Sequence, residues 1–125
     1  MLTDREVTVM LPATDLARAQ AWYEEKLGLK PQKTEEYGST YILNGGTPMF
    51  LYETEFAGTA KHTLLSIATD DLEADMKSLR GRGVTFVDYD TPGLKTTNGI
   101  AEFGPVKNAW FTDPDGNIIG LVQGM

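Results

Sequence analysis

The alternation of apolar and polar residues predicts a strand followed by a helix near the start of the chain. The stretch "EVTVMLPA" (Glu6–Ala13) is rich in β-branched and apolar residues, which is typical of a strand. In the next stretch, "LARAQAWYEEKL", the apolar positions Leu16, Ala19, Tyr23 and Leu27 follow the spacing i, i+3, i+7, i+11. That spacing gathers them on one helical face, so we expect this face to be buried against the strands.

Capping residues predict where this helix and a second one begin and end. Thr14-Asp15 offers an N-cap to the first helix, and Gly28 offers its C-terminal stop. In the second half, Asp70 is followed three residues later by Glu73, which is the spacing of a capping box. We therefore expect a second helix over "DLEADMKSLRGR", with its apolar stripe at Leu72, Met76 and Leu79 and its stop at Gly83.

Short strand-like segments fill the rest of each half. In the first half they cover roughly 29–34, 39–43 and 48–53, with turn residues between them. In the second half a strand over 62–69 precedes the helix, and "VTFVDY", "GIAEFG", "NAWFTD" and "NIIGLVQ" follow it. We therefore interpret each half as βαβββ, with one additional strand-like segment in the second half, and expect the polar segment 55–61 between the halves to be a linker.

A short repeat supports duplication of one half. "ATDL" at 13–16 returns as "ATDDL" at 68–72, an offset of 55 or 56 residues that the Asp70-Asp71 doublet leaves open. Each half is too small to close a core comfortably by itself. We expect one domain over residues 1–125, with module one at about 5–54 and module two at about 62–123.

The residues resemble the vicinal oxygen chelate superfamily, which includes glyoxalase I, extradiol dioxygenases and bleomycin-resistance proteins. The stretches that carry the resemblance are "PATDLARAQAWYEEKLGL", "LYE", "TDDLEADMKSLRGRGVTF", "AWFTDPDGN" and the strand after it. The resemblance implies an α+β fold in which two tandem βαβββ modules form curved mixed sheets around a ligand cavity. It also implies a homodimer.

In metal-using members of that superfamily, each module supplies one ligand from its first strand and one from its last, usually His or Gln with Glu. The matching positions here hold Thr8, Phe50, Leu64 and Gly120, with Thr63 in place of Leu64 at the other register. None of these side chains is a histidine or a carboxylate. The resemblance therefore implies no metal and no cofactor in this chain.

The same comparison implies a mostly apolar ligand site with a few polar groups. Its expected lining is Thr8, Met10, Phe50, Tyr52, Leu64, Trp110 and Gly120, with His62 or Glu102 as polar anchors. Other interpretations stay open. The single histidine, His62, can be an exposed residue at the start of a strand, and Glu102 can face outward. Each aromatic residue can equally belong to the core.

Composition narrows the class of partner. The net charge is −7 with scattered Lys and Arg, which argues against a nucleic-acid or anionic-membrane surface. The chain has no cysteine, no apolar run of membrane-spanning length and no signal-peptide pattern at its start. We therefore expect a cytoplasmic protein.

Three functional hypotheses follow. The first is metal-independent binding of a small hydrophobic or aromatic organic molecule, as in bleomycin-resistance-type sequestration, with no catalytic residue assigned. The second is a glyoxalase-like lyase or isomerase, in a metal-free or a metal-dependent form. Its chemistry would use Glu53, Glu102 or His62, or metal ligands at another register. The third is a structural or protein-interaction module.

Overall fold

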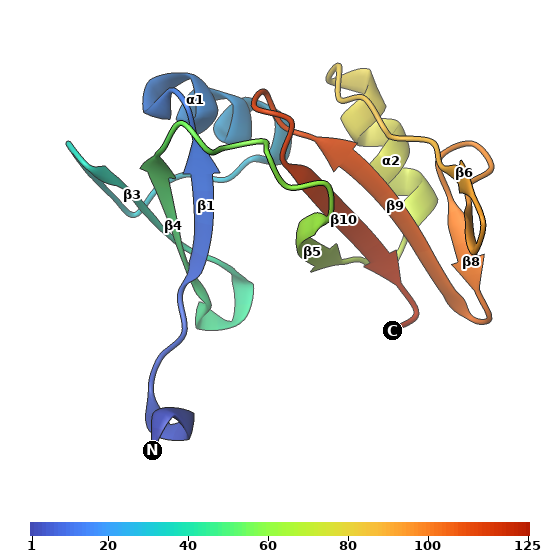
Figure 1. Ribbon diagram of the computed structural model, residues 1–125, viewed down its shortest axis with the longest axis horizontal. Helices are drawn as coiled ribbons and strands as arrows, with labels where there is room; N and C mark the ends of the chain where they lie inside the picture. The colour runs from blue at the N-terminus through green and yellow to red at the C-terminus, as the bar shows by residue number, and fades with distance from the viewer. The chain divides into compact units, whose positions relative to one another are not determined.

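The computed structural model describes residues 1–125, which form two compact units, Met1–Ala57 and Gly58–Met125 (Figure 1). The boundary falls inside the polar segment 55–61. Each unit contains one helix and a four-stranded mixed sheet, and the strand order in the two sheets is equivalent. The expected α+β architecture of two tandem βαβββ modules is confirmed.

The first unit holds a sheet in the order β1-β4-β3-β2. Strand β1 runs parallel to β4, and the other neighbours are antiparallel. The elements are η1 (Leu2–Asp4), β1 (Val9–Ala13), α1 (Leu16–Leu27), β2 (Lys33–Glu35), β3 (Gly38–Ile42), η2 (Asn44–Gly46) and β4 (Pro48–Glu53).

The second unit repeats this arrangement in the order β5-β10-β9-β8, with β5 parallel to β10. It also contains a two-stranded hairpin, β6-β7, between its helix and β8. The elements are β5 (Thr63–Ala68), α2 (Leu72–Gly81), β6 (Asp90–Thr91), β7 (Leu94–Lys95), β8 (Ala101–Phe103), β9 (Val106–Thr112) and β10 (Ile118–Gln123).

Each helix buries its apolar stripe against one side of its sheet. In α1 the buried residues are Ala19 and Tyr23, and in α2 they are Leu72, Met76 and Leu79. Because successive side chains of a strand point to opposite sides of a sheet, alternate residues of the central strands are buried on the helix side. In the first unit these include Leu11, Ala13, Met49 and Leu51, and in the second Ala109, Phe111, Ile119 and Leu121.

Both helices begin with the same type of N-cap, an aspartate, at equivalent positions. Asp15 accepts a hydrogen bond from Arg18 N at 3.0 Å, and Asp71 accepts one from Ala74 N at 3.1 Å. The expected cap at Asp70 is therefore wrong by one residue. Asp15 and Asp71 occupy equivalent positions in the two units, so the offset between the repeats is 56 residues at the helix starts.

A second duplicated contact ties the end of each sheet to its helix. Glu53, the last residue of β4, accepts a hydrogen bond from Leu16 N at 3.2 Å. Gln123, the last residue of β10, accepts one from Leu72 N at 2.7 Å. Each side chain satisfies an amide in the first turn of the helix, which has no partner within the helix.

The segment "VTFVDY" (84–89) is not the strand that its composition predicts. It makes only a bridge between Phe86 and Phe111, and Val87 N donates to Trp110 O over 2.8 Å. The chain then turns into the β6-β7 hairpin instead of extending along β9. The remaining edge of β9 is paired with β8.

Candidate functional site

Each sheet has one side that its helix does not cover, which we call the open face of that unit. In the first unit, alternation along β1 and β4 places Met10, Phe50 and Tyr52 on the open face. Met10 is 49% exposed, and both aromatic residues are partly exposed. These three residues are therefore not core, although an aromatic-rich strand could equally have packed inward.

Strand pairing brings the open-face residues of the first unit together. Met10 is paired with Phe50 across the β1-β4 ladder, and Phe50 with Thr40 across β4-β3. The Phe50 ring also lies over Gly38, where an added Cβ would overlap it, and its centroid is 6.0 Å from that of Tyr37. Thr8 is exposed and precedes β1.

Gly120 lies at the centre of the open face of the second unit. It is buried in β10, where it pairs with Ser66 of β5 and Trp110 of β9. A Cβ at Gly120 would lie 3.1 Å from Ser66 Oγ and 3.4 Å from Thr63 Cγ2. Any larger side chain there would have to push these two residues aside or project away from the sheet.

The indole of Trp110 is held in place beside this glycine. Its Nε1–H donates to Thr63 Oγ1 over 3.0 Å, and its ring meets the Tyr89 ring edge-on, with centroids 5.3 Å apart at 88°. Trp110 is nevertheless partly exposed. A partly exposed aromatic ring in a fixed orientation is a suitable stacking surface for a planar ligand.

Sequence reasoning missed Ser66 and Tyr89. Tyr89 reaches Trp110 from the irregular segment after α2, and no periodicity links the two positions. The position of Ser66 depends on a bulge in β5 that the sequence pattern does not reveal. Ile118 pairs with Thr63 and Ile119 with Leu65, so Leu64 is the extra residue. The bulge leaves Thr63 as well as Ser66 next to Gly120, which simple counting along the strand does not predict.

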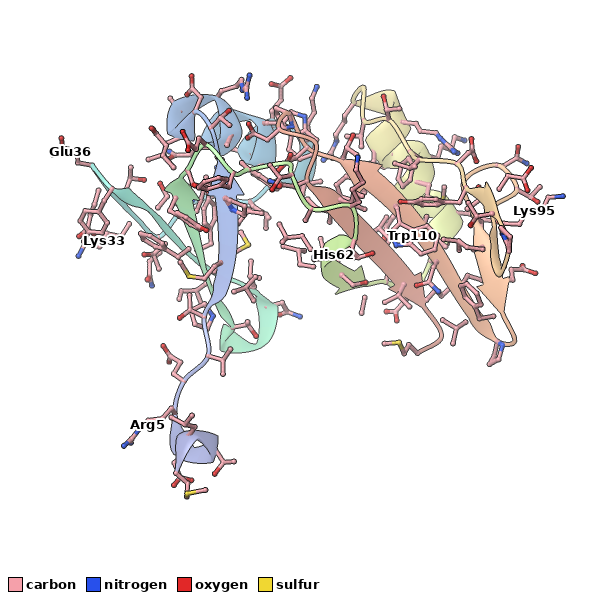
Figure 2. The ribbon with its side chains drawn as sticks, in the orientation of Figure 1. Arg5, Lys33, Glu36, His62, Lys95 and Trp110 are labelled. Carbon is pink, nitrogen blue, oxygen red and sulfur yellow. The ribbon has the colours of Figure 1, made fainter.

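His62 stands apart from the sheet ladder. It is exposed just before β5, and its Nδ1 lies 3.0 Å from Thr63 O (Figure 2). Figure 2 shows it near the start of β5, with Trp110 on β9. The histidine is next in sequence to Thr63, the partner of Trp110, so it lies at the end of the strand that borders the open face.

The two carboxylates considered for acid–base chemistry lie elsewhere. Glu102 pairs with Lys107 across β8 and β9, and alternation places both on the side of the sheet that faces α2, opposite Trp110. Glu53 is engaged with Leu16 N at the start of α1. Neither carboxylate shares a face with the Gly120 region.

The residues at the four superfamily ligand positions do not fit a divalent metal ion. Thr8, Phe50, Leu64 and Gly120 offer one hydroxyl and no imidazole or carboxylate. No group of three or more His, Cys, Asp or Glu residues is placed to hold a metal ion anywhere in residues 1–125.

The family model of the Glyoxalase/Bleomycin resistance protein/Dioxygenase superfamily matches residues 7–121. The chain therefore belongs to this superfamily, and the resemblance seen in its sequence is confirmed. None of the curated proteins compared with the chain matches it. Neither helix has the length and apolar character to span a membrane.

Several solved structures share the fold over nearly their whole length. The antibiotic-binding protein TnmS3 from Streptomyces sp. CB03234 is 26% identical, with a TM-score of 0.71 over 97% of this chain and 96% of that one. A glyoxalase/bleomycin resistance protein from Catenulispora acidiphila is 22% identical, with a TM-score of 0.70 over 96% and 98%. The fosfomycin resistance protein FosX from Listeria monocytogenes is 11% identical, with a TM-score of 0.72 over 95% and 92%.

Proposed function

We propose that this protein binds a small hydrophobic or aromatic organic molecule on the open faces of its sheets, without a metal ion, and sequesters it unchanged. The observation that carries the proposal is the arrangement around Gly120. A partly exposed indole is oriented by Thr63 and Tyr89, next to a strand position that has no side chain.

The physical basis is apolar burial with a defined stacking surface. An aromatic ligand over Trp110 would bury part of its own surface and the exposed part of the indole, at about 25 cal/mol per Å² before ordering costs. The Trp110 orientation is already set by its hydrogen bond, so little side-chain entropy remains to be lost on binding. Ser66 and Thr63 supply hydroxyls at the edge of this surface.

The first unit supports the same class of ligand. Its open face presents Met10, Phe50 and Tyr52, and Tyr37 next to Phe50 is 68% exposed. Met and aromatic side chains are adaptable contacts for flat apolar molecules. Thr8 precedes β1 in the first unit, and in the second unit His62 precedes β5 and Leu64 is the bulge residue of that strand. We include each of them in the proposed ligand surface of its own unit, whereas Glu102 lies on the other side of its sheet.

The family supports this proposal at a coarser level. TnmS3 is described as an antibiotic-binding protein, and FosX as a fosfomycin resistance protein. We propose antibiotic or metabolite sequestration by analogy with the first of these, and a homodimeric state as the resemblance implies. Light scattering of the purified protein gives its mass in solution, and a monomer at all concentrations would contradict the dimer.

The test is a screen of aromatic antibiotics and metabolites by thermal shift and by quenching of Trp110 fluorescence, with Trp22→Phe removing the other indole. A bound compound should be recovered chemically unchanged. Conversion of the compound to a product would contradict sequestration and favour a lyase or isomerase. No binder in a broad panel would argue against the proposal.

Gly120→Leu supplies the site-specific control. The added side chain should fill the position beside Trp110 and weaken binding at least tenfold, about 1.4 kcal/mol. Gly81→Leu is the matched substitution, because Gly81 has ordinary φ and open space around its Cβ. If Gly120→Leu does not fold, Trp110→Ala addresses the same contact. Undiminished binding by either folded variant would exclude this face as the site.

A further inference from the structure

The second unit has a groove on the opposite side of its sheet from Trp110, between α2 and the segment that leads into β8. Its volume is about 690 Å³, and it is lined by Glu73, Met76, Arg80, Lys95, Thr97, Asn98, Ile100 and Glu102. The wall opposite α2 is built by Lys95, Thr97, Asn98 and Ile100, which belong to the segment 82–100 that joins α2 to β8. The first unit has only residues 28–32 between α1 and β2, so it has no counterpart of this wall.

Arg80, which lines the groove, is held in position by two contacts. One Nη donates to Asn98 O over 3.0 Å, and the guanidinium lies over the Phe86 ring at 5.1 Å from its centroid. A guanidinium has five N–H donors. The contact with Asn98 uses one of its nitrogens, which leaves donors for an anionic group in the groove. An arginine that is already oriented loses little entropy when it binds a carboxylate.

The loop that holds Arg80 is itself well fixed. Asp88 accepts hydrogen bonds from Thr96 Oγ1 at 2.9 Å and from Gly99 N at 3.0 Å. Between these anchors, Asn98 is the only residue other than glycine with positive φ, at 54°. This conformation presents the Asn98 carbonyl to Arg80. The structure therefore maintains an unfavoured backbone geometry at the point where it orients the guanidinium.

The groove also carries charge of the opposite sign, and Lys107 lies across from one of its carboxylates, Glu102, on the same side of the sheet. Glu73 lies two turns before Arg80 on the same side of α2, and Glu102 extends from β8. Neither carboxylate forms an ion pair with Arg80 or Lys95. A site for a simple anion would be weakened by two carboxylates, and a site for a simple cation by an arginine. Met76 and Ile100 contribute apolar surface to the same groove.

We propose that this groove binds a small zwitterion with a carboxylate and an ammonium group, namely an α-amino acid or a short peptide. The carboxylate lies against Arg80, the ammonium lies toward Glu102 and Glu73, and the side chain contacts Met76 and Ile100. Lys95, which Figure 2 shows on the outer side of the hairpin, lies at the rim. A ligand in this groove does not compete for space with one over Trp110, because the groove lies on the other side of the sheet.

The test is a titration of the full-length protein with single L-amino acids and with the dipeptide Ala-Ala, followed by amide chemical shifts. Acetate and methylammonium, which carry the two charges separately, are titrated in parallel. We expect at least one zwitterion to shift the resonances of residues 73–80 and 95–102 saturably, and to bind at least tenfold more tightly than either half.

Three variants make the result specific. Arg80→Gln and Glu102→Gln should each weaken the zwitterion at least fivefold, whereas Lys77→Gln, an exposed charge on α2 outside the groove, should change nothing. If Arg80→Gln does not fold, the exposed Glu102→Gln still tests the proposal. No saturable shift with any zwitterion overturns it. Equal binding of acetate alone, or loss with Lys77→Gln as large as with Arg80→Gln, also overturns it.

Discussion

Trp110 of β9 donates its indole N–H to the hydroxyl of Thr63 on β5, across the intervening strand β10, over 3.0 Å. The bond crosses the sheet at Gly120, the one residue between them that has no side chain to obstruct it. The absence of a side chain at Gly120 and the orientation of Trp110 are therefore one structural feature.

Replacing Thr63 with valine should release the indole while preserving the shape of its neighbour. The unpaired N–H should destabilise the fold by about 1 kcal/mol and broaden the range of Trp110 orientations. Urea unfolding and tryptophan fluorescence anisotropy, in the Trp22→Phe background, measure the two effects. Thr63→Ser keeps the acceptor and should behave like the parent. A valine variant with unaltered anisotropy would mean that the hydrogen bond does not orient the ring.

Glu53 and Gln123 each accept a hydrogen bond from the first helical amide at the ends of equivalent strands. A glutamine should therefore be able to replace Glu53. Glu53→Gln retains an amide oxygen for Leu16 N and should change the free energy of unfolding by at most about 0.5 kcal/mol. Glu53→Ala leaves that amide without the side-chain acceptor and should lower the free energy of unfolding by about 1 kcal/mol. Chemical denaturation measures both. A glutamine variant as unstable as the alanine variant would show that the contact needs the charge.

The position of the second N-cap can be checked with neighbouring aspartates. Asp71→Ala should destabilise the protein by about 1 kcal/mol, because it removes the acceptor for Ala74 N. Asp70→Ala should have a much smaller effect, since the side chain of Asp70 does not cap α2. The thermal midpoints of the two variants, measured side by side, decide the question, and a larger loss at Asp70 would contradict the assignment.

The turn between β9 and β10 holds the residue that begins the second unit. Asn117 Oδ1 accepts from Gly58 N over 2.9 Å, and its amide donates to Asp113 Oδ2 over 2.8 Å. A Cβ at Gly58 would overlap the Asp115 carbonyl, and its φ is +75°. Gly58→Ala should therefore destabilise the protein by about 3 kcal/mol or more.

Gly45 provides the control for this substitution. At its φ of +85° an alanine would be strained to a similar degree, but nothing lies within 4 Å of an added Cβ. Gly45→Ala should cost only about 1 kcal/mol, the part of the effect due to φ alone. Urea midpoints of the two variants separate the clash from the strain. Equal losses would show that Asp115 moves away without resistance.

Tyr41 makes the stability of the first unit sensitive to alkaline pH. Its side chain is buried on the α1 side of the sheet, and its hydroxyl has no hydrogen-bond partner. Burial first, and then the nearby Glu24 carboxylate, raise the pKa of the phenol above its ordinary value of 10.0. The folded protein therefore retains the proton more strongly than the unfolded chain.

The sign of the effect follows from that difference. The contribution of Tyr41 to stability is complete below pH 10 and is lost as the pH rises from there through the folded-state pKa. Tyr41→Phe should remove this part of the alkaline loss, and it should change stability little at pH 7 because the hydroxyl makes no bond. Urea unfolding at pH 8 and at pH values above 10 tests it. Parallel pH profiles for parent and variant would contradict the prediction.

Local signals were sufficient for both helices and for most of the strands, but not for the segment 84–95, where an irregular stretch and the β6-β7 hairpin replace the expected strand. The apolar spacing from Leu16 to Leu27 gives the first helix, because a 3.6-residue period is a property of adjacent turns. Gly28 and Asp15 mark its ends by the backbone geometry and hydrogen bonds that they support locally. The repeat of "ATD" then indicates the duplication, and the resemblance to the superfamily implies the fold.

Long-range pairing decided the surroundings of the candidate site. The bulge at Leu64 shifts β5 against β10 and sets Ser66 beside Gly120, 54 residues away in the chain. Pairing with Lys107 turns Glu102 away from Trp110, and the irregular segment after α2 brings Tyr89 to it. Each of these contacts depends on how strands that are distant in the sequence align with one another. Short-range sequence patterns do not determine that alignment. The sequence alone determined which modules form, and only the tertiary structure determined which side chains meet on their faces.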